Sequence, residues 1–377
     1  MKLLYLANTR MPSEKAHTLQ IAKMLEAFAS AGQEVTLLLT NRKNEIKQNI
    51  FDYYQLRVKF NIRHIINYFW FVEAANKKLY FKLVRLVFNS NAFFYGLLAK
   101  VDVIYSREIF VSYLLSLFGR PVVFEDHEPK NSQLWLYKFF LKNIKKKVIV
   151  PPQLEKLYQA WQVKNYLVAP NGVDLTEMER AYFDKNIWQK EFNFNAKDFV
   201  VLYVGHFYQW KGVYTLLDAA KKLDSTFKVV MIGGTAADRS AVREYIVDHQ
   251  LAKVYLKEFV PHSQIYQYMK AADVLVLPNT AQEERSAKYT TPIKLFEYLG
   301  SGVPIVASDL ESFSYFLANG SNALLFRPDD AQDLADKIMA IKNQLQVARD
   351  LARQAQAAAK NFTWQSRAEK IINFIKA

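Results

Sequence analysis

Short apolar runs alternate with amphipathic stretches along the whole chain, and this alternation predicts repeated strand–helix units. Residues 2–7 form an apolar run, and apolar side chains within 21–28 then follow the helical spacing i, i+3, i+4, i+7. Gly32 ends the predicted helix, and residues 35–39 form the next apolar run. This βαβ pattern is typical of a parallel sheet, which binds ligands at the carboxyl ends of its strands.

The same pattern continues through both halves of the chain, although no sequence repeat is visible. We predict further strands, with helices between them, at 101–105, 122–125, 147–150, 166–169, 199–204, 227–232, 253–256, 273–277, 304–307 and 323–326. A chain of 377 residues is long for one hydrophobic core, so the predicted fold class is α/β with two domains. We expect these domains at 1–180 and 181–361, followed by an amphipathic helix at 362–377 that docks on the rest of the protein.

Residues 171–197 are the expected connection between the two domains. The Asn-Gly pair at 171–172 predicts a tight turn with positive φ angles. The chain then becomes polar over residues 185–198 before the apolar run at 199–204 begins. This change in composition favours a linker.

Basic residues are in excess and are concentrated in one region. The formal net charge is +14, and residues 42–85 hold ten basic and three acidic residues with aromatic side chains between them. Lys142 and residues 145–147 form a smaller basic cluster. Such a region suits anionic lipid headgroups or nucleic acid, and an ordinary solvated surface is the alternative.

The chain contains no cysteine, which excludes disulfides, thiolate metal sites and a cysteine nucleophile. Its first ten residues have too short an apolar run for a signal peptide. The longest apolar stretch, at 109–118, is far shorter than the roughly 18–20 residues that span a bilayer. We therefore expect a cytoplasmic protein that can also lie on the cytoplasmic face of a membrane.

The segment 288–308 combines a predicted helix with groups that suit a nucleoside diphosphate. Thr291 and Pro292 are expected to open the helix, with Thr291 accepting from its first amides. Lys294 and Glu297 are three residues apart and share one helical face. The amides and the lysine would face phosphate oxygens, and Glu297 would accept hydrogen bonds from ribose hydroxyls. An ordinary surface helix with an ion pair is the alternative.

A glycine-containing loop follows the predicted strand at 199–204. Gly205 lets the backbone approach a ligand, and Lys211 supplies a positive charge for phosphate at the start of the predicted helix 213–222. The loop is not a Walker A motif, because its second glycine follows the lysine and no hydroxyl group is placed for magnesium.

Polar residues also gather after two strands of the first half. The run 125–128 places three carboxylates around His127 at the end of a strand, which favours an active-site rim. Three carboxylates without spaced histidines are a poor zinc motif, so no metal site is expected. The loop and helix after strand 2–7 carry Arg10, Ser13, Lys15, His17 and Gln20. They include no GxGxxG motif, which argues against a nicotinamide dinucleotide.

Several of these segments have the order and spacing of the retaining glycosyltransferases of family 4, which the chain resembles over essentially its whole length. They are 170–174, 205–212, 233–234 and 291–308, with a weaker match at 13–17 and Gln20. The resemblance implies the GT-B fold, with two Rossmann-like domains facing across a cleft and a last helix, from Trp364, that crosses back to the N-terminal domain. It also implies that the C-terminal domain holds a nucleoside diphosphate sugar without a metal or other cofactor.

The resemblance further implies roles for individual residues. Lys211 matches the family's diphosphate-binding lysine, Glu297 its ribose-binding glutamate and His127 a histidine beside the reacting sugar. The donor site would also contain Gly205, His206, Thr291, Ile293 and Lys294, and the acceptor side would contain Lys15, His17 and Gln20. The catalytic candidates are His127, which would orient the sugar, and Lys211 with His206, which would stabilise the leaving diphosphate.

Two positions depart from the family's pattern. His206 replaces the arginine that usually follows the glycine of the phosphate loop. Tyr289 replaces the first glutamate of the E-x7-E motif, whose second member is Glu297. Because that first glutamate usually contacts the donor sugar, the motif does not indicate which sugar is bound; Glu283 and Glu284 are alternative contacts.

The predicted activity is transfer of a sugar, with retention, from a nucleoside diphosphate sugar to an acceptor hydroxyl in surface polysaccharide or glycolipid assembly. The expected acceptor is a saccharide or a lipid-linked saccharide, with residues 42–85 facing an anionic membrane. A non-hydrolysing sugar-nucleotide epimerase and a phosphorylase are alternatives on the same fold. A basic nucleic-acid-binding protein is less favoured, because it leaves Lys211 and Glu297 without a role, so no nucleic acid is expected.

Overall fold

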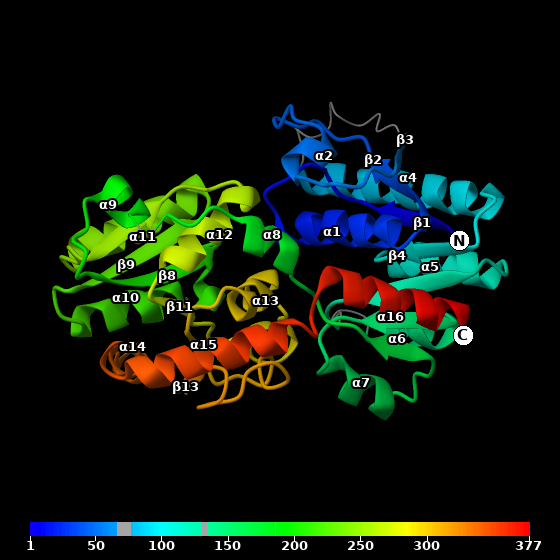
Figure 1. Ribbon diagram of the computed structural model, residues 1–377. Helices are drawn as coiled ribbons and strands as arrows, with labels where there is room; N and C mark the ends of the chain where they lie inside the picture. Colours follow the sequence, from blue (N-terminus) through cyan, green and yellow to red (C-terminus); the bar gives the residue numbers. More distant parts are fainter. Residues whose placement is uncertain (66–76, 130–133, 185) are drawn as a thin grey trace. The chain divides into compact units, whose positions relative to one another are not determined.

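Two compact units, each built on its own sheet, make up the chain (Figure 1). Unit 1 comprises Met1–Asn171 and Trp364–Ala377, and unit 2 comprises Gly172–Thr363. The structure, a computed structural model, describes residues 1–65, 77–129, 134–184 and 186–377.

The sheet of unit 1 has the strand order β3-β2-β1-β4-β5-β6-β7, and its paired strands are parallel. The strands are β1 (Lys2–Ala7), β2 (Glu34–Thr40), β3 (Asn61–Ile65), β4 (Val103–Ser106), β5 (Val122–Asp126), β6 (Lys146–Ile149) and β7 (Tyr166–Val168). The sequence did not predict β3, because Asn61, Arg63 and His64 on this edge strand are exposed and leave it without an apolar run.

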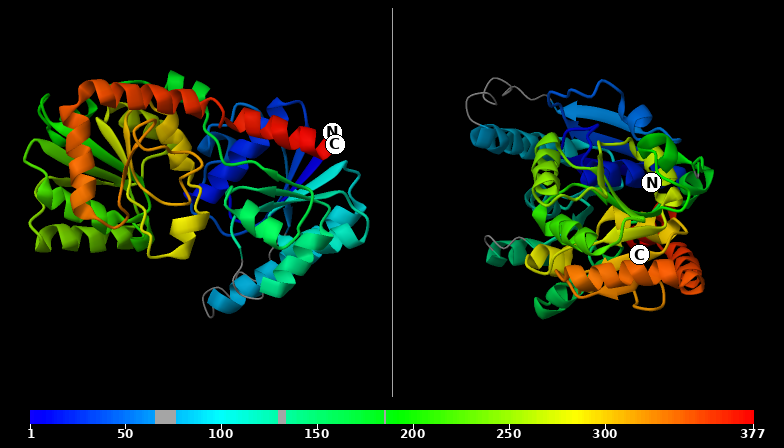
Figure 2. Two further views of the ribbon diagram at one scale, coloured as in Figure 1. Left: turned by 90° about the horizontal axis from the view of Figure 1, so that it is seen from below. Right: turned by 90° about the vertical axis from the view of Figure 1, so that its left-hand side faces the viewer.

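Helices cover both faces of this sheet. They are α1 (Ala16–Ser30), α2 (Ile50–Tyr53), α4 (Lys77–Leu98), α5 (Ile109–Leu117), α6 (Leu134–Asn143), α7 (Leu154–Ala160) and α16 (Trp364–Lys376). Since crossovers between parallel strands are right-handed, α1 lies on one face and α4, α5 and α6 lie on the other. The last helix, α16, packs against α1 (Figure 1), whereas α5 packs between α4 and α6 (Figure 2).

The sheet of unit 2 is also parallel, with the strand order β10-β9-β8-β11-β12-β13. Its strands are β8 (Phe199–Gly205), β9 (Phe227–Gly233), β10 (Val254–Lys257), β11 (Val274–Leu277), β12 (Ile305–Ser308) and β13 (Leu324–Phe326). Each lies within one residue of its predicted bounds, because these strands are buried and their apolar runs are continuous. The predicted α/β fold class is confirmed.

Helices pack on both faces of this second sheet as well. They are α8 (Leu175–Arg180), α9 (Ile187–Phe192), α10 (Val213–Lys222), α11 (Ala236–Asp248), α12 (His262–Ala271), α13 (Ile293–Gly300), α14 (Ala331–Asn343) and α15 (Leu345–Ala359), with a short 3-10 turn at Gln209–Lys211 and a π-helical turn at Arg285–Tyr289. Neighbouring strand residues enter two separate hydrophobic clusters, Leu202 and Val230 in one and Val201 and Val229 in the other. The sheet is therefore buried on both faces.

The connection between the units differs from the linker that the sequence predicted. Helices α8 and α9 lie within the expected linker, and Met178 and Trp188 from these helices lie in the hydrophobic core of unit 2. Asp174 caps α8 through its carboxylate. The Asn171-Gly172 pair has no positive φ angle. The division falls at residue 171 rather than 180 because the apolar residues beyond it pack into unit 2.

Helix length and the basic region both bear on contact with a membrane. Among the described residues, no helix is both long enough and apolar enough to cross a bilayer. Tyr68, Phe69, Trp70 and Phe71, which belong to the predicted basic and aromatic region, lie outside the described residues.

Gly212 fixes the loop between β8 and α10 through its backbone. It has a φ of +69°, and a Cβ atom here would lie 1.6 Å from the carbonyl oxygen of Pro278. Gly320 has a similar φ of +72°, but no described atom lies within 4 Å of its Cβ position. A side chain at Gly320 would therefore add backbone strain alone, whereas a side chain at Gly212 would add both backbone strain and a steric overlap.

We predict that Gly320→Ala lowers the free energy of unfolding only by the left-handed strain, roughly 1–2 kcal/mol. Gly212→Ala should lower it by at least about 3 kcal/mol, because the loop must also move away from Pro278. Urea denaturation of both variants measures the difference. Equal losses in the two variants would contradict the steric explanation.

Candidate functional site

The loops after β8 and β9 meet the start of α13 in unit 2. Gly205 ends β8 with a φ of +137°, and its carbonyl oxygen accepts from the amide of Gly234 at 3.1 Å. A Cβ atom on Gly205 would lie 3.6 Å from the Nζ of Lys294. The structure thus brings together the glycine loops and the lysine that the sequence analysis assigned to phosphate binding.

The side-chain amine of Lys294 lies at this point and has no counter-ion among the described residues. Its Nζ is buried, has no hydrogen-bond partner within the described part of the chain, and lies 3.9 Å from the centroid of the Tyr203 ring. Burial first, and then repulsion by Lys211, hold the pKa of Lys294 well below its usual value, and Glu297 opposes this only partly. A bound anion would relieve the cost of this unpaired charge.

Lys211 is a second cation of the same site. It ends the 3-10 turn before α10, and its Nζ lies 3.8 Å from the centroid of the Trp210 ring. Burial, followed by repulsion from Arg285, lowers the pKa of Lys211 from 10.5 to about 7. An anion placed near Lys211 and Lys294 would raise both pKa values.

Glu297 does not pair with Lys294; its partner is His262 on α12. The Nε2 atom of His262 lies 2.6 Å from the Oε1 of Glu297, and the Nδ1 of the same ring lies 3.9 Å from a carboxylate oxygen of Glu177. Sequence reasoning missed His262, which is 35 residues from Glu297. Its position at the start of the helix after β10 was the available signal, because side chains there face the ligand-binding edge of a parallel sheet.

The start of α13 also differs from the prediction. The helix begins at Ile293 with Pro292 as its N-cap, and no side chain caps its first amides. Thr291 is buried but lies one residue too early to cap the helix. The absence of a side-chain cap leaves the helix start suited to an anion, in line with the position of Lys294.

His206 and Tyr289, the two departures from the family pattern, lie in different surroundings. The ring of His206 stacks on Tyr208 with centroids 5.0 Å apart, and Tyr208 stacks in turn near Trp210. Tyr289 ends the π-helical turn, and burial raises its pKa. Glu284, one proposed substitute for the missing glutamate, is exposed and pairs with Lys288 at 3.3 Å.

In unit 1, the buried carboxylate of Glu125 joins several candidate residues. Its Oε1 accepts from Gln20 Nε2 at 2.9 Å and lies 2.7 Å from His127 Nε2. Its Oε2 accepts from the Tyr105 hydroxyl at 2.5 Å and from a terminal nitrogen of Arg367 at 2.7 Å. Sequence reasoning did not find Arg367, which is 242 residues from Glu125 and carries no local motif.

His127 is neutral near pH 7. Burial, and then the charge of Arg107, lower its pKa to about 4, although the hydrogen bond to Glu125 opposes this shift. Burial alone would raise the pKa of Glu125, but Arg367 and His127 outweigh it and hold that pKa well below its usual value. The side chain of His127 remains 24% exposed, so a ligand can reach the ring.

Only one of the three carboxylates around His127 contacts its ring. Asp126 instead accepts from the hydroxyls of Tyr137 and Tyr158, which anchor it to α6 and α7. Within the ranges that the structure describes, no three His, Cys, Asp or Glu side chains are grouped to hold a metal ion.

The acceptor-side candidates lie at the start of α1. His17 Nε2 lies 2.9 Å from the Thr9 hydroxyl, and burial, followed by Arg107, lowers the pKa of His17 to about 4. The side-chain oxygen of Gln20 accepts from Arg107 at 3.2 Å. His17, Gln20 and His127 therefore gather around Arg107, whereas Lys15 is exposed at the N-cap of α1.

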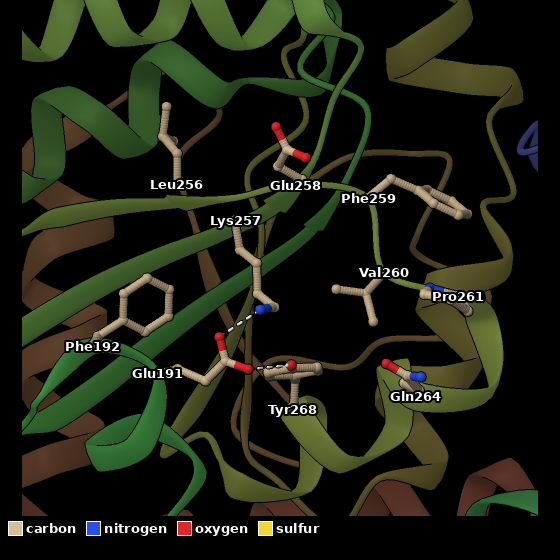
Figure 3. Close-up of a pocket in the computed structure, with 10 residues that line it drawn as sticks. All are labelled: Glu191, Phe192, Leu256, Lys257, Glu258, Phe259, Val260, Pro261, Gln264 and Tyr268. Carbon is tan, nitrogen blue, oxygen red and sulfur yellow. Dashed lines mark hydrogen bonds and ion pairs between the residues drawn. The ribbon is translucent and has the colours of Figure 1, made fainter.

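A separate hollow of about 510 Å³ lies beside the end of β10 (Figure 3). Two of its charged groups pair with each other, because Glu191 accepts from Lys257 at 2.5 Å, and Glu191 also accepts from the Tyr268 hydroxyl at 2.9 Å. None of Lys211, Lys294 and Glu297 lines it. An anion would therefore find no free lysine in this hollow, whereas the Nζ of Lys294 has no partner among the described residues.

The chain is similar to known glycosyltransferases. The family model described as Glycosyl transferases group 1 matches residues 184–361. The glycosyltransferase MJ1178 of Methanocaldococcus jannaschii, which is uncharacterized, is 25% identical over 52% of this chain and 53% of its own length. The D-inositol 3-phosphate glycosyltransferase of Nocardia farcinica is 24% identical over 60% of this chain and 50% of its own length. The chain thus spans about half the length of the curated relatives it matches.

Solved structures match the entire chain at low sequence identity. Anabaena Alr3699/HepE, in complex with UDP, has a TM-score of 0.78 and 18% identity, and each chain is covered completely. Sucrose-phosphate synthase from Thermosynechococcus elongatus also has a TM-score of 0.78 and 18% identity, over 100% of this chain and 98% of its own. Residues 184–361 are therefore a glycosyl transferases group 1 domain, in a chain that has the fold of the GT-B glycosyltransferases.

Proposed function

We propose that the protein transfers a sugar from a nucleoside diphosphate sugar to the hydroxyl group of an acceptor. The observation that carries this proposal is the buried, unpaired ammonium of Lys294 beside Gly205, with the second cation, Lys211, close by. In the family that the chain resembles, the lysine that Lys211 matches binds the diphosphate. An epimerase would use the same cations, but the family model that matches residues 184–361 is of glycosyl transferases. A nucleic-acid-binding protein would leave the buried Lys294 without a role.

The chemistry that the site has to supply is stabilisation of the leaving diphosphate. Lys211, Lys294 and the uncapped amides at the start of α13 provide positive charge where negative charge develops as the glycosidic bond breaks. Because these groups belong to the protein, we propose that transfer is independent of a metal ion. We further propose that it proceeds with retention, and that an oxygen of the leaving phosphate takes the proton of the acceptor hydroxyl on the same face of the sugar.

Uracil is the base that we propose for the donor. HepE was solved with UDP and with UDP-glucose, and Staphylococcus aureus TarM with UDP. Glu297 would accept from the ribose hydroxyls, with His262 giving up one carboxylate oxygen. For the acceptor we propose a saccharide of a glycoconjugate, since solved neighbours include WaaB and WaaG, which act in lipopolysaccharide assembly.

We also propose peripheral contact with an anionic membrane, through the face formed by α4, α5 and α6. The sequences of these three adjacent helices contain no aspartate or glutamate. Ring contacts between Phe93 and Phe118 and between Tyr113 and Phe139 join them. Exposed large apolar side chains on them are Leu79, Phe81, Leu86, Phe94, Tyr95, Leu98, Phe110, Leu117, Leu134, Trp135 and Phe139. With the exposed Lys82, Arg85 and Lys142, this face suits acyl chains and anionic headgroups.

Replacing Lys294 with methionine should raise the stability of the protein and weaken its binding of UDP. Without ligand, Lys294→Met should raise the free energy of unfolding by roughly 1 kcal/mol at pH 7, because burial disfavours the ammonium in the folded state. This gain should disappear as the pH rises towards 10.5, where the lysine of the unfolded chain also loses its proton. UDP should raise the melting temperature of the wild type but not that of the variant.

Thermal and urea unfolding with and without UDP measure both effects. Lys100→Met, which changes an exposed lysine in unit 1, is the control and should respond to UDP as the wild type does. An equal response of the Lys294→Met variant to UDP would mean that the diphosphate lies elsewhere.

The lowered pKa of Lys211 predicts that UDP binding takes up protons. With a pKa of about 7 this side chain is mostly neutral at pH 8, and a nearby diphosphate raises the pKa again. Affinity for UDP should therefore fall as the pH rises above 7. Calorimetry at pH 8 in buffers of different ionisation enthalpy gives the number of protons bound. Lys211→Arg stays protonated, so it should reduce that number by about one; an unchanged number would contradict the assignment.

Vesicle sedimentation tests the membrane face. The wild type should pellet with phosphatidylcholine vesicles that contain phosphatidylserine, and less with phosphatidylcholine alone. Trp135, which is 74% exposed, should insert its ring, so Trp135→Ser should weaken binding by about tenfold or more. Leu345→Ser removes a side chain of unit 2 that is 62% exposed and should have no effect. Equal pelleting of all three proteins would rule out this face.

A further inference from the structure

We propose that Arg367 and Glu125 hold His127 as the tautomer protonated on Nε2, so that its Nδ1 accepts a hydrogen bond from a hydroxyl group of the substrate. Arg367 is then a positioning residue, since it touches Glu125 and not the substrate. The identity of that hydroxyl group rests on the proposed function, whereas the tautomer of His127 does not.

The first step of the argument is that Glu125 is a carboxylate. Its side chain is fully buried, and the guanidinium of Arg367, with 3% exposure, lies 2.7 Å from its Oε2. Arg367 is always charged, and a buried charge of this kind needs a counter-ion. Among the described residues, the carboxylate of Glu125 is the only ion-pair partner that Arg367 has.

The second step is that the carboxylate determines which ring nitrogen of His127 carries the proton. Gln20 Nε2, the Tyr105 hydroxyl and Arg367 all donate to Glu125, and a carboxylate has no proton to donate in return. His127 Nε2, at 2.7 Å from Oε1, must therefore donate as well. In a neutral ring the other nitrogen, Nδ1, is then an acceptor.

The third step is that the ring of His127 stays neutral and that its Nδ1 has no hydrogen-bond partner among the described residues. The titratable and charged groups that act on His127 are Glu125 on β5, Arg107 after β4, Arg367 on α16 and His17 on α1. The two arginines oppose a second proton on the ring. Nδ1 of His127 has no hydrogen-bond partner among the described residues, so this nitrogen can accept from a ligand.

The fourth step concerns the last helix. Arg367 reaches Glu125 from α16, and its Nε donates to the carbonyl oxygen of Ala169 at 3.0 Å, beyond the end of β7. Two bonds in different directions hold the guanidinium in one orientation. The final helix, α16, therefore positions the ring of His127 through the buried carboxylate of Glu125, in addition to packing on α1.

Nitrogen NMR of the whole protein labelled with 15N-histidine tests the tautomer directly. The chain has six histidines, and His127→Gln assigns the signal. At pH 7 the wild type should show a protonated Nε2 and an unprotonated Nδ1. Glu125→Gln, whose amide can donate to the ring, should allow the opposite tautomer and change both ring signals. Tyr105→Phe removes one donor to Glu125 but keeps the carboxylate, and should leave both signals unchanged.

A functional readout follows from the same variants. Arg367→Gln should lower kcat by about tenfold or more through loss of the correct tautomer, while the Kd for UDP stays unchanged, and Arg367→Lys should recover part of kcat. If Arg367→Gln does not fold, Arg367→Lys and Glu125→Gln still decide the question. A wild-type ring protonated on Nδ1, or charged at pH 7, would overturn the proposal. Absence of any sugar transfer would instead refute the proposed function and leave the NMR result standing.

Discussion

Parallel sheets impose one constraint on which the whole arrangement depends. Each strand of a parallel sheet is followed by a crossover that must cover a face of the sheet, so the loops with free polar groups collect at the carboxyl ends of the strands. In unit 2 these loops carry Gly205, Lys211 and His262, and in unit 1 the end of β5 carries Glu125 and His127. In both units the candidate functional residues therefore lie at the carboxyl ends of the strands, although no sequence repeat relates the units.

The two units differ in how fully their buried charged groups are paired. In unit 1 the ion pair of Arg367 and Glu125 is enclosed and every carboxylate oxygen has partners, so this network is rigid before any ligand arrives. In unit 2 the cations Lys211 and Lys294 lack such compensation, and both have lowered pKa values. Unit 2 is thus under electrostatic strain that an anion would remove, a combination typical of binding sites and rare in purely structural networks.

The sequence predicts the strands well and the long-range contacts poorly. Buried strands such as β8 and β11 have continuous apolar runs that need no tertiary information, whereas the exposed edge strand β3 has no such run. Lys211 and Lys294 could be proposed for phosphate binding because loop, lysine and helix follow one another along the chain. Arg367 and His262 were missed because their partners lie 242 and 35 residues away and only the folded sheets bring them together.

In the proposed site, the ribose of the donor and His262 would compete for one carboxylate, that of Glu297. Glu297 is buried, and its Oε1 already lies 2.6 Å from the imidazole of His262. A ribose that bonds through both hydroxyl groups needs both carboxylate oxygens, so it has to share Oε1 with the histidine or displace it. Glu177 lies 3.9 Å from the other nitrogen of the imidazole, so a small movement of the ring would bring the displaced imidazole to a second carboxylate. In the proposed site, His262 would therefore keep Glu297 oriented without ligand, and Glu177 would lower the cost of releasing Glu297 to ribose.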